Sequence, residues 1–376
     1  MFMYTITLFT LGTETDVHYL LALGAQLQKQ GLHVCLAAAS AFQPLARKLG
    51  LSFQALAVDS ERENFTQLDI EEQQYRGLLQ QVQQLAENSN LMAVHNPYLP
   101  IIRALGPLPC QVMAVALRAE EVFSCFSKPQ GLLQRIACWL KRSKRIEPYL
   151  PTLYNFSPRL MAGQEEQANH LHLSGQWAIP DSLQWTFSGR GPSPALCDWM
   201  YRGGRPVFFD FSQAPESDRE HLLNMVKELS QKTGFRALIC TQWATCEEGL
   251  LQRDIFCVKA PVQEWLFQQC SAVIHYRQSD KLPAAIRAGV PSILCASGTI
   301  ANFWGQILTE NGIGIHLRKE PPTAAALEAA LEQVLRLSMQ YKAKMMGKAM
   351  QEEDGLDYTA NAVARQVGME RVAVAV

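Results

Sequence analysis

The sequence lacks an excess of charge of either sign. Lysine and arginine together number 34, aspartate and glutamate 35, and the formal charge is -1 over 376 residues. Proteins that hold nucleic acid mainly through its phosphates carry a basic excess. The charge balance therefore disfavours nucleic acid as a partner and leaves room only for local basic patches.

Long apolar runs and a secretory leader are also missing. The first residues, MFMYTITLFTLGTETD, have neither a basic start nor an extended apolar stretch, so no signal peptide is expected. No uninterrupted apolar run reaches the about 20 residues that a membrane-spanning helix requires. These observations predict a cytoplasmic protein.

The ten cysteines form no C-x-x-C pair, and most lie inside apolar runs such as HVCLAAA and PSILCA. This pattern predicts buried free thiols in a reducing compartment. It does not support a zinc site, and no cofactor is predicted.

What the sequence does contain is enough apolar material, 48% of the residues, for two hydrophobic cores. Strand-like and helix-like patterns alternate in the first half, beginning with the apolar runs MYTITLFTL, HVCLAAA and LSFQALAV. Strand-helix-strand units of this length imply parallel pairing through right-handed crossovers. The first half is therefore predicted to be an α/β domain.

The composition changes over residues 174–204, where Gly, Pro and Ser gather with three tryptophans. The alternation restarts at Pro206 with PVFFDF, FRALICT, IFCVKA and SAVIHY. We predict an α/β domain over 1–180, a connection over 181–204, a second α/β domain over 205–355 and a final segment, 356–376. Open parallel sheets bind ligands at the carboxyl ends of their strands, so a cleft between the halves is the predicted site.

Three stretches carry a resemblance to a known family. The opening of the bacterial macrolide, glycopeptide and sterol glycosyltransferases, with its Gly-Ser-x-Gly-Asp-Val loop, resembles LGTETDVHYLLALGAQLQKQGLHVCLAAASAFQPLARKLGLSF. Their second domain resembles PVQEWLFQQCSAVIH, AAIRAGVPSILC and NGIGIHL, and their C-terminal tail resembles EEDGLDYTANAV. The resemblance implies a GT-B fold, in which two Rossmann-like doubly wound domains face a central cleft and the C-terminal helix packs on the first domain.

The same resemblance implies an activity. Such enzymes move a sugar from a nucleotide diphosphate donor to a lipophilic natural-product or lipid acceptor, and they do so without a metal. An inverting member needs a base that takes the proton of the acceptor hydroxyl. Asp16 matches the loop aspartate and Thr13 the loop serine, and His18 lies two residues on, so Asp16 and His18 are the catalytic candidates. The alternative for Asp16 is a helix N-cap, since an aspartate just before a helix accepts from its free N–H groups.

The acceptor pocket is expected in the first half and largely apolar. Its candidate residues are Thr13, His95 and Tyr98, the last two because they follow the predicted strand LMAV. For His95 a structural role is the alternative.

The donor motif departs from the family pattern. Relatives carry His-His-Gly-Gly-x-Gly-Thr-Thr, whose second His and backbone N–H groups hold the pyrophosphate at a helix N-terminus. The aligned stretch is His275, Tyr276, Arg277, Gln278, Ser279, Asp280, Lys281 and Leu282. If Ser279 or Asp280 caps the following helix, its side chain occupies the place where the diphosphate sits in relatives. With Asp280 that side chain would also be negatively charged. Arg277 and Lys281 are the counter-argument, because two cations could rebuild a phosphate site.

Other donor positions differ as well. Ile300 and Ala301 replace an Asp-Gln pair that holds sugar hydroxyls, and Val262 replaces a histidine. Trp243 aligns where relatives carry a Gly-Trp pair, and its ring either stacks on the base or packs in the core. We therefore predict that binding of the nucleotide sugar is weakened or redirected.

Two functions follow from this reasoning. The first is glycosyl transfer in natural-product or lipid tailoring. The second is a pseudo-glycosyltransferase, a GT-B scaffold that binds a small molecule or a partner enzyme, or that uses a non-standard donor. The basic amphipathic segment 132–146 is predicted to be a solvated helix face, with peripheral membrane contact as the alternative.

Overall fold

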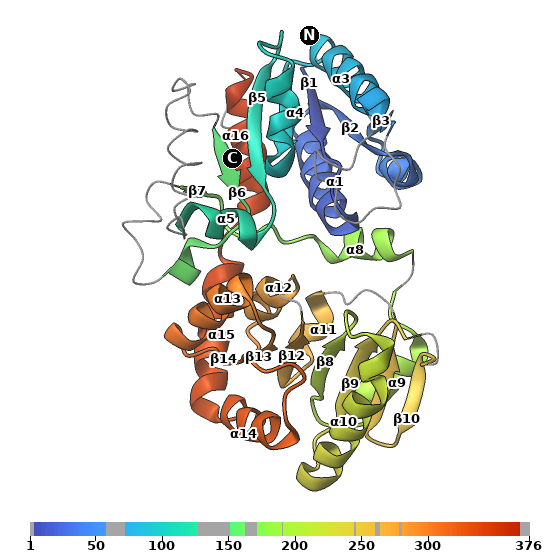
Figure 1. Ribbon diagram of the computed structural model, residues 1–376, viewed down its shortest axis with the longest axis vertical. Coiled ribbons are helices and arrows are strands. Elements are labelled where there is room, and N and C mark those ends of the chain that lie inside the picture. The colour runs from blue at the N-terminus through green and yellow to red at the C-terminus, as the bar shows by residue number, and fades with distance from the viewer. Residues whose placement is uncertain are drawn as a thin grey trace, which may run out of the picture. The chain divides into compact units, whose positions relative to one another are not determined.

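The computed structural model describes residues 4–57, 72–126, 151–161, 171–189, 191–243, 246–259, 264–277 and 280–368. They form two compact units (Figure 1). The first unit comprises 1–158, 164–179 and 354–376, and the second comprises 159–163 and 180–353. The basic segment 132–146 lies outside the described residues.

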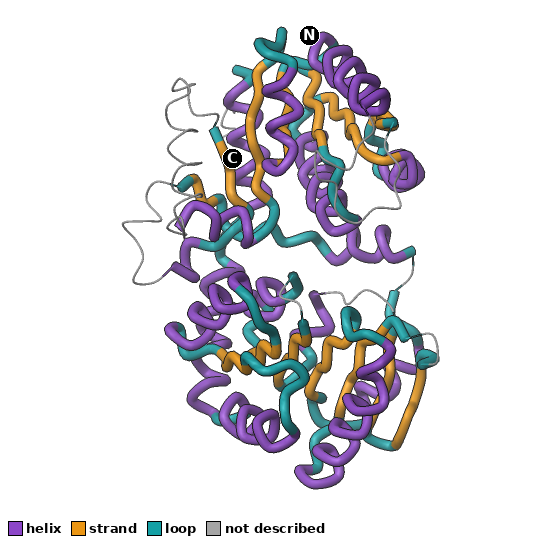
Figure 2. Tube along the Cα trace, in the orientation of Figure 1, coloured by secondary structure: helices purple, strands orange, loops and turns teal. Residues whose placement is uncertain are grey.

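The first unit is built on a seven-stranded parallel sheet. Its strand order is β3-β2-β1-β4-β5-β6-β7, which is a doubly wound order. Helices cover both faces (Figure 2), so the central strands are buried on both sides and read as continuous apolar runs. The strands are β1 (Thr5–Phe9), β2 (His33–Ala39), β3 (Ser52–Leu56), β4 (Leu91–His95), β5 (Gln111–Ala116), β6 (Thr152–Tyr154) and β7 (His172–Leu173).

The helices of the first unit include one from the far end of the chain. Helix α16 (Gly355–Gln366) packs against α1 (Glu14–Lys29), and the Gln26 amide donates to the Asp357 carboxylate at 3.0 Å. A side chain at Gly355 would overlap the backbone, because its Cβ would lie 2.4 Å from the Gly175 carbonyl oxygen. The other helices are α2 (Gln43–Lys48), α3 (Glu72–Glu87), α4 (Leu99–Ala104) and α5 (Ala119–Phe126).

The second unit repeats this architecture. Its sheet has the order β10-β11-β9-β8-β12-β13-β14, and only β10 is antiparallel to its neighbour. Without β10 the order is that of the first six strands of the other sheet. The strands are β8 (Val207–Phe211), β9 (Ala237–Thr241), β10 (Gly249–Gln252), β11 (Ile255–Val258), β12 (Ala272–Tyr276), β13 (Ser292–Cys295) and β14 (Gly314–Leu317).

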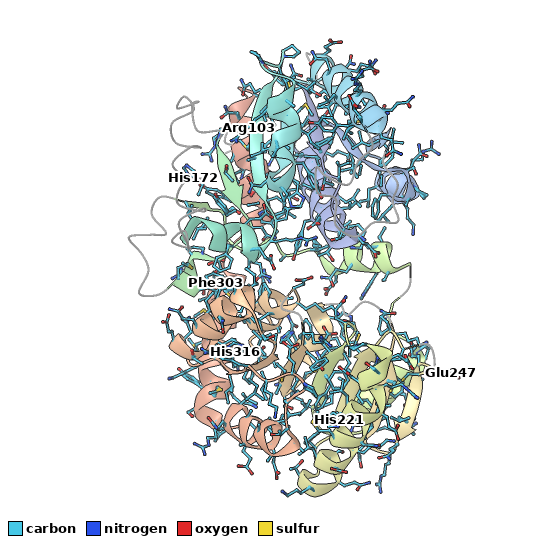
Figure 3. All side chains as sticks on the ribbon, viewed as in Figure 1. Arg103, His172, His221, Glu247, Phe303 and His316 are labelled. Atoms are coloured by element: carbon cyan, nitrogen blue, oxygen red, sulfur yellow. The ribbon has the colours of Figure 1, made fainter. Side chains whose placement is uncertain are left out.

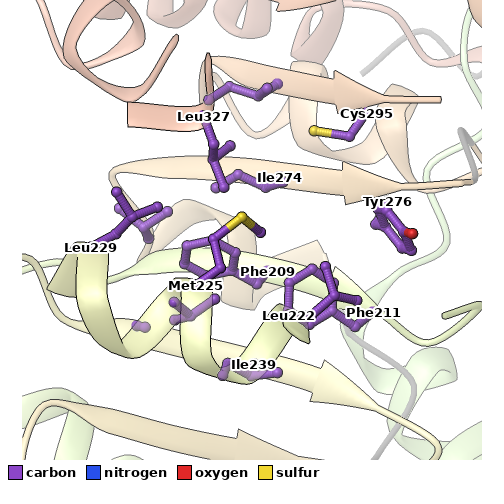
Figure 4. Close-up of a cluster of buried hydrophobic side chains, with 14 of the residues drawn as sticks. Phe209, Phe211, Leu222, Met225, Leu229, Ile239, Ile274, Tyr276, Cys295 and Leu327 are labelled. Carbon is purple, nitrogen blue, oxygen red and sulfur yellow. The ribbon is translucent and has the colours of Figure 1, made fainter. Parts of the chain in front are cut away.

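The core on one face of this sheet is shown in Figure 4. Phe209 and Ile274 from the sheet meet Met225 from α10 and Leu327 from α14. The helices of the unit are α8 (Asp181–Ser188), α9 (Pro194–Tyr201), α10 (Arg219–Thr233), α11 (Glu264–Gln268), α12 (Leu282–Arg287), α13 (Thr299–Glu310), α14 (Ala324–Val334) and α15 (Leu337–Gln351).

The segment expected to be a connection, 181–204, contains two helices. Pro194 begins α9, and the Ser193 hydroxyl caps it by accepting from the Leu196 N–H. Leu196 and Trp199 are buried in the second core, and the Trp199 indole donates to the Arg253 carbonyl at 3.2 Å. The end of this segment is thus a packed part of the second unit, because its tryptophan and leucine supply core surface.

The eight cysteines whose side chains the structure describes are free thiols, and five of them are buried. In the described part of the chain, none of the helices combines the length and the apolar character that crossing a bilayer requires.

Candidate functional site

Each sheet has one point where the strand order reverses. It lies between β1 and β4 in the first sheet and between β8 and β12 in the second. Open α/β sheets bind ligands outside the carboxyl ends of the strands at such a switch point. Polar side chains gather at both of them.

A buried polar chain crosses the first switch point. Thr10, directly after β1, hydrogen-bonds through its hydroxyl to Nδ1 of His95, the last residue of β4, at 3.0 Å. Nε2 of His95 lies 3.2 Å from Oε1 of Glu121, and that oxygen accepts from the backbone N–H groups of Leu117 and Arg118. Thr10, His95 and Glu121 are all buried. The ends of β1, β4 and β5 are therefore joined by side chains.

Asp16 stands beside this chain, in the first turn of α1. Its carboxylate accepts from Nε and Nη2 of Arg118 at 2.8 and 2.5 Å, and from the backbone N–H and hydroxyl of Thr13 at 2.8 and 3.0 Å. The contact with the Thr13 N–H is the reciprocal bond of a capping box. A side chain at Gly12 would overlap this carboxylate, since its Cβ would lie 2.4 Å from Oδ2.

The electrostatics fix the protonation states here. Burial alone would raise the pKa of Asp16, but the hydrogen bonds and charge of Arg118 more than offset it, so the pKa is lowered and Asp16 is ionised at neutral pH. Burial, together with the negative charge of Asp16, raises the pKa of Tyr98 to about 12. Tyr98 is therefore a neutral phenol beside a charged pair.

The structure brings together four of the five residues predicted for this half. Thr13 and Asp16 are bonded, the rings of His95 and Tyr98 are 5.4 Å apart, and the Asp16 charge acts on Tyr98. His18 lies two residues after Asp16 on α1, so the two side chains leave the helix in different directions. Its Nε2 lies 3.6 Å from the Glu14 carboxylate, and burial lowers its pKa although Glu14 acts to raise it.

Sequence reasoning missed Thr10, Arg118 and Glu121. A signal for two of them was present, since LRAEE places a cation and two carboxylates directly after the buried strand CQVMAVA. Their side-chain partners lie 26 to 105 residues away, which no local pattern reveals.

The second switch point holds a buried ion pair. Asp210 on β8 and His275 on β12 are paired in register and both fully buried. Nζ of Lys281 lies 3.0 Å from the Asp210 carboxylate and 3.3 Å from the Ser212 hydroxyl. Burial lowers the pKa of His275 to about 4, so this ring is neutral. Burial acts to raise the pKa of Asp210, but the charge of Lys281 together with the hydrogen bonds from Ser212 and Lys281 lowers it.

Tyr276 and Arg277 occupy the positions aligned with the second His and first Gly of the family motif. The Tyr276 ring packs edge-on against Phe211 in the core (Figure 4). Its hydroxyl donates to Asp218 at 2.8 Å. Arg277 has a left-handed backbone with φ 62°, a conformation that glycine adopts more readily. Its guanidinium lies 3.5 Å from Asp218 and 3.4 Å from Glu320.

Arg277 and Lys281, the two candidate phosphate ligands, are thus both neutralised from within the unit. A diphosphate would have to compete with the carboxylates of Asp210, Asp218 and Glu320. Helix α12 begins after Lys281, which occupies the N-cap position in place of the expected Ser279 or Asp280, and Asp280 is exposed. Val262 and Ser279 lie outside the described residues.

The remaining donor candidates are structural in this conformation. Trp243 is buried, its ring stacks on Phe211 with 5.9 Å between centroids, and its indole donates to the Ala214 carbonyl at 2.9 Å. This is the core packing that sequence reasoning held as the alternative to base stacking. On α13, Ala301 is buried and Ile300 half-buried.

Two further histidines belong to neither switch point (Figure 3). His172 is exposed on the edge strand β7. His316 is hydrogen-bonded to the Ala296 carbonyl at 2.8 Å, and it fits because Gly305 has no side chain: a Cβ there would lie 2.1 Å from the ring.

The sequence is similar to known glycosyltransferases. Residues 256–366 match the family model of the erythromycin biosynthesis protein CIII-like C-terminal domain. A sterol 3-beta-glucosyltransferase of Aspergillus oryzae is 26% identical over 230 residues, which are 58% of this chain and 16% of that protein. One of Leptosphaeria maculans is 23% identical over 98% of this chain and 29% of its own length. The chain thus spans less than a third of these curated relatives.

Solved structures share the fold over nearly the whole chain. The glycotransferase of kitacinnamycin has a TM-score of 0.70 at 14% identity, covering 97% of this chain and 99% of its own. A calicheamicin glycosyltransferase has a TM-score of 0.70 at 13% identity, with 99% and 100% covered. A spinosyn rhamnosyltransferase reaches 0.66 at 18% identity, with 98% and 100% covered. The chain thus has the GT-B fold of these solved glycosyltransferases, and residues 256–366 are similar to the C-terminal domain of the erythromycin biosynthesis protein CIII-like family.

Proposed function

We propose that the chain transfers a sugar from a nucleotide diphosphate donor to a hydroxyl of a lipophilic acceptor, with inversion and without a metal. The observation that carries this proposal is the polar network at the first switch point, which joins Thr10, His95 and Glu121 and adjoins Asp16 and Arg118. The relatives, which include sterol glucosyltransferases and natural-product glycosyltransferases, support the acceptor class.

We assign the acceptor end to Tyr98, Thr13 and His95. The half-buried Tyr98 ring lies 6.5 Å from Phe9 and 5.4 Å from His95, between an apolar core and the polar network. A neutral phenol there can donate a hydrogen bond to an acceptor oxygen while its ring contacts an apolar skeleton. This environment is better suited to an apolar alcohol than to a charged substrate.

Of the two catalytic candidates, His18 suits proton acceptance better. The Asp16 oxygens already accept four hydrogen bonds, and a lowered pKa makes a carboxylate a weaker base. His18 is neutral at neutral pH, and Glu14 at 3.6 Å can stabilise the imidazolium that forms. We propose His18 as the base and Asp16 as the residue that positions Arg118.

A second candidate function has its own observation. The second switch point buries Tyr276 and pairs Arg277 and Lys281 with carboxylates, which supports a scaffold that binds a small molecule without transferring sugar. If the chain is an enzyme, its donor is held in another pose than the family's.

One experiment separates the two functions. The purified chain is incubated with a panel of UDP- and dTDP-sugars and a panel of sterols and macrolide aglycones, and acceptors are analysed by mass spectrometry. A product heavier by one sugar supports transfer. Calorimetric binding of an aglycone without product from any donor supports the scaffold, and the absence of both would contradict the proposal.

A further inference from the structure

Helix α15 carries a row of exposed apolar side chains. Leu337 is 87% exposed, Tyr341 65% and Met345 45%. Residues four apart lie above one another on a helix, so the three form one stripe. Large apolar side chains that stay exposed singly are common, but an aligned row on one helix marks an interaction surface.

Lysines share this face. Lys344 and Lys348 are also four apart and fall within the same arc as the stripe, and Lys342 and Arg336 flank it; all four are exposed. Residues 337–351 contain no aspartate or glutamate. Within α15 this face is therefore both apolar and cationic, and the exposed Glu352 follows it at the C-cap.

The opposite face of α15 fixes the helix to the second unit. A Cβ on Gly347 would lie 2.4 Å from the Gly289 Cα, so the helix contacts the chain after α12 at backbone distance. The Gln351 amide donates to the Arg287 carbonyl at 2.7 Å, and the Gln340 amide donates to the Ser271 carbonyl at 3.2 Å. Core packing thus accounts for the inner face alone and leaves the stripe unpartnered among the described residues.

We propose that this α15 stripe, Leu337, Tyr341 and Met345 with Lys344 and Lys348, docks the protein on an anionic lipid membrane. A helix lying in the headgroup region needs one apolar face and flanking cations, which is what α15 presents. A stable protein interface buries about 800 Å² per partner, more than three side chains in a row provide. Lysine stems can cover the apolar row while their ammonium groups meet lipid phosphates.

The docking does not depend on the proposed sugar transfer, because it uses residues away from both switch points. If the chain does transfer sugar, membrane docking would bring it to the surface of the bilayer in which a lipophilic acceptor is dissolved. The predicted contact through 132–146 is a separate hypothesis, which the experiment below distinguishes because its variants leave that segment unchanged.

The test is flotation of the full chain with vesicles. Phosphatidylcholine vesicles are compared with vesicles that also contain about 30% phosphatidylserine, because anionic lipid attracts nearby lysines. The variants are Leu337→Ser/Tyr341→Ser and Lys344→Glu/Lys348→Glu. Tyr201→Ser, which removes a 96% exposed tyrosine of α9, and Arg47→Glu/Lys48→Glu, on the exposed surface of α2, are the matched controls. Thermal unfolding checks that every variant is folded.

We expect wild type and both controls to float with the anionic vesicles and to be released by high salt. Each lysine near an anionic surface contributes about fivefold in partitioning, so the charge-reversal variant should bind at least tenfold more weakly. The serine variant should lose about as much, since it removes the apolar anchor. Unchanged binding of the folded variants, or equal loss in the controls, would overturn the proposal. Retention of wild type on polyglutamate through the same side chains, without vesicle binding, would instead assign the stripe to an acidic protein.

Discussion

The guanidinium of Arg118 donates to both carboxylate oxygens of Asp16, although 102 residues separate them in the chain. The pair joins the loop after β1 to the loop after β5, on either side of the first switch point. Asp16 thus serves two purposes at once: it accepts from Thr13 at the start of α1, and it holds Arg118 in place. The alternative that Asp16 is the N-cap is wrong: α1 begins at Glu14, Thr13 is its N-cap, and Asp16 is the third helical residue, which closes the capping box.

The Asp16→Asn substitution should make the free energy of unfolding depend less on pH in the acidic range. Because the pKa of Asp16 is lowered in the folded state, its contribution is complete above the ordinary value of 3.8 and is lost as the pH falls through the folded pKa. We expect the variant to be about 2 kcal/mol less stable at neutral pH and the difference to shrink in acid. Urea unfolding at several pH values measures this, with the exposed Glu72→Gln as control. A difference that stays constant with pH would rule the mechanism out.

His18→Gln should abolish most sugar transfer. Loss of a general base costs about 10²–10⁴ in kcat. Burial lowers the pKa of His18 from 6.5, so the wild-type rate should fall only below that pH, as the ring becomes protonated, and the variant should lack this acid limb. His33→Gln, on β2, is the control, because that ring hydrogen-bonds to Ser52. A glutamine variant that keeps the wild-type pH profile would remove His18 from the mechanism.

Asp218→Asn combined with Glu320→Gln should strengthen pyrophosphate binding. Both substitutions keep the shape around Arg277 but remove the charges that neutralise it. We expect affinity for UDP or dTDP, measured by calorimetry, to rise about tenfold. Glu216→Gln is the matched control, since Glu216 lies two residues before Asp218 and pairs with Arg219 instead. Equal affinity in the double variant and wild type would show that these carboxylates do not oppose the diphosphate.

Tyr276→His should not restore the family's donor site. The tyrosine fills the core against Phe211, so the smaller, more polar ring should cost about 2 kcal/mol or more of unfolding free energy. Tyr276→Phe, which keeps the ring and loses only the bond to Asp218, should cost about 1 kcal/mol. Thermal unfolding of the pair separates packing from hydrogen bonding, and a histidine variant as stable as wild type would contradict the core assignment.

Gly355→Ala should loosen the C-terminal helix. The added Cβ would lie 2.4 Å from the Gly175 carbonyl oxygen, so α16 would have to shift, at a cost of about 2 kcal/mol. Gly77→Ala, inside α3 with open space around it, should instead stabilise by about 0.5–1 kcal/mol. Urea unfolding should give changes in unfolding free energy of opposite sign for the two variants, and this comparison tests the packing of α16. A neutral Gly355→Ala would mean that the helix is not held there.

Hydrophobic pattern was sufficient to predict the two α/β units, because strands buried on both faces leave continuous apolar runs such as ALIC in β9. The antiparallel edge strand β10 was missed, since GLLQ is short and exposed over most of its length and resembles a loop. The α9 helix was hidden by the surrounding glycines and prolines. Edge and connecting elements owe their structure to tertiary contacts more than to periodicity.

Only some residues of the candidate site could be predicted from the sequence, for a related reason. Asp16 and Thr13 were predicted because they match a short loop motif of the family, which can be recognised from the local sequence alone. Arg118 and Glu121 could not be predicted as site residues, because their partners Asp16 and His95 come close only in the folded chain. The sequence shows that Tyr276 replaces the family's histidine, but it does not show that the ring packs in the core.

The left-handed backbone at Arg277 has a consequence for engineering. The chain there follows a path that suits glycine, so a glycine-rich loop could be grafted at this position without re-routing the end of β12. Such a design would also have to replace side chains: the carboxylates of Asp218 and Glu320, which pair with Arg277, and the ring of Tyr276, which packs in the core. At Arg277 the second unit thus already has the backbone conformation that a glycine of an anion-binding loop would use.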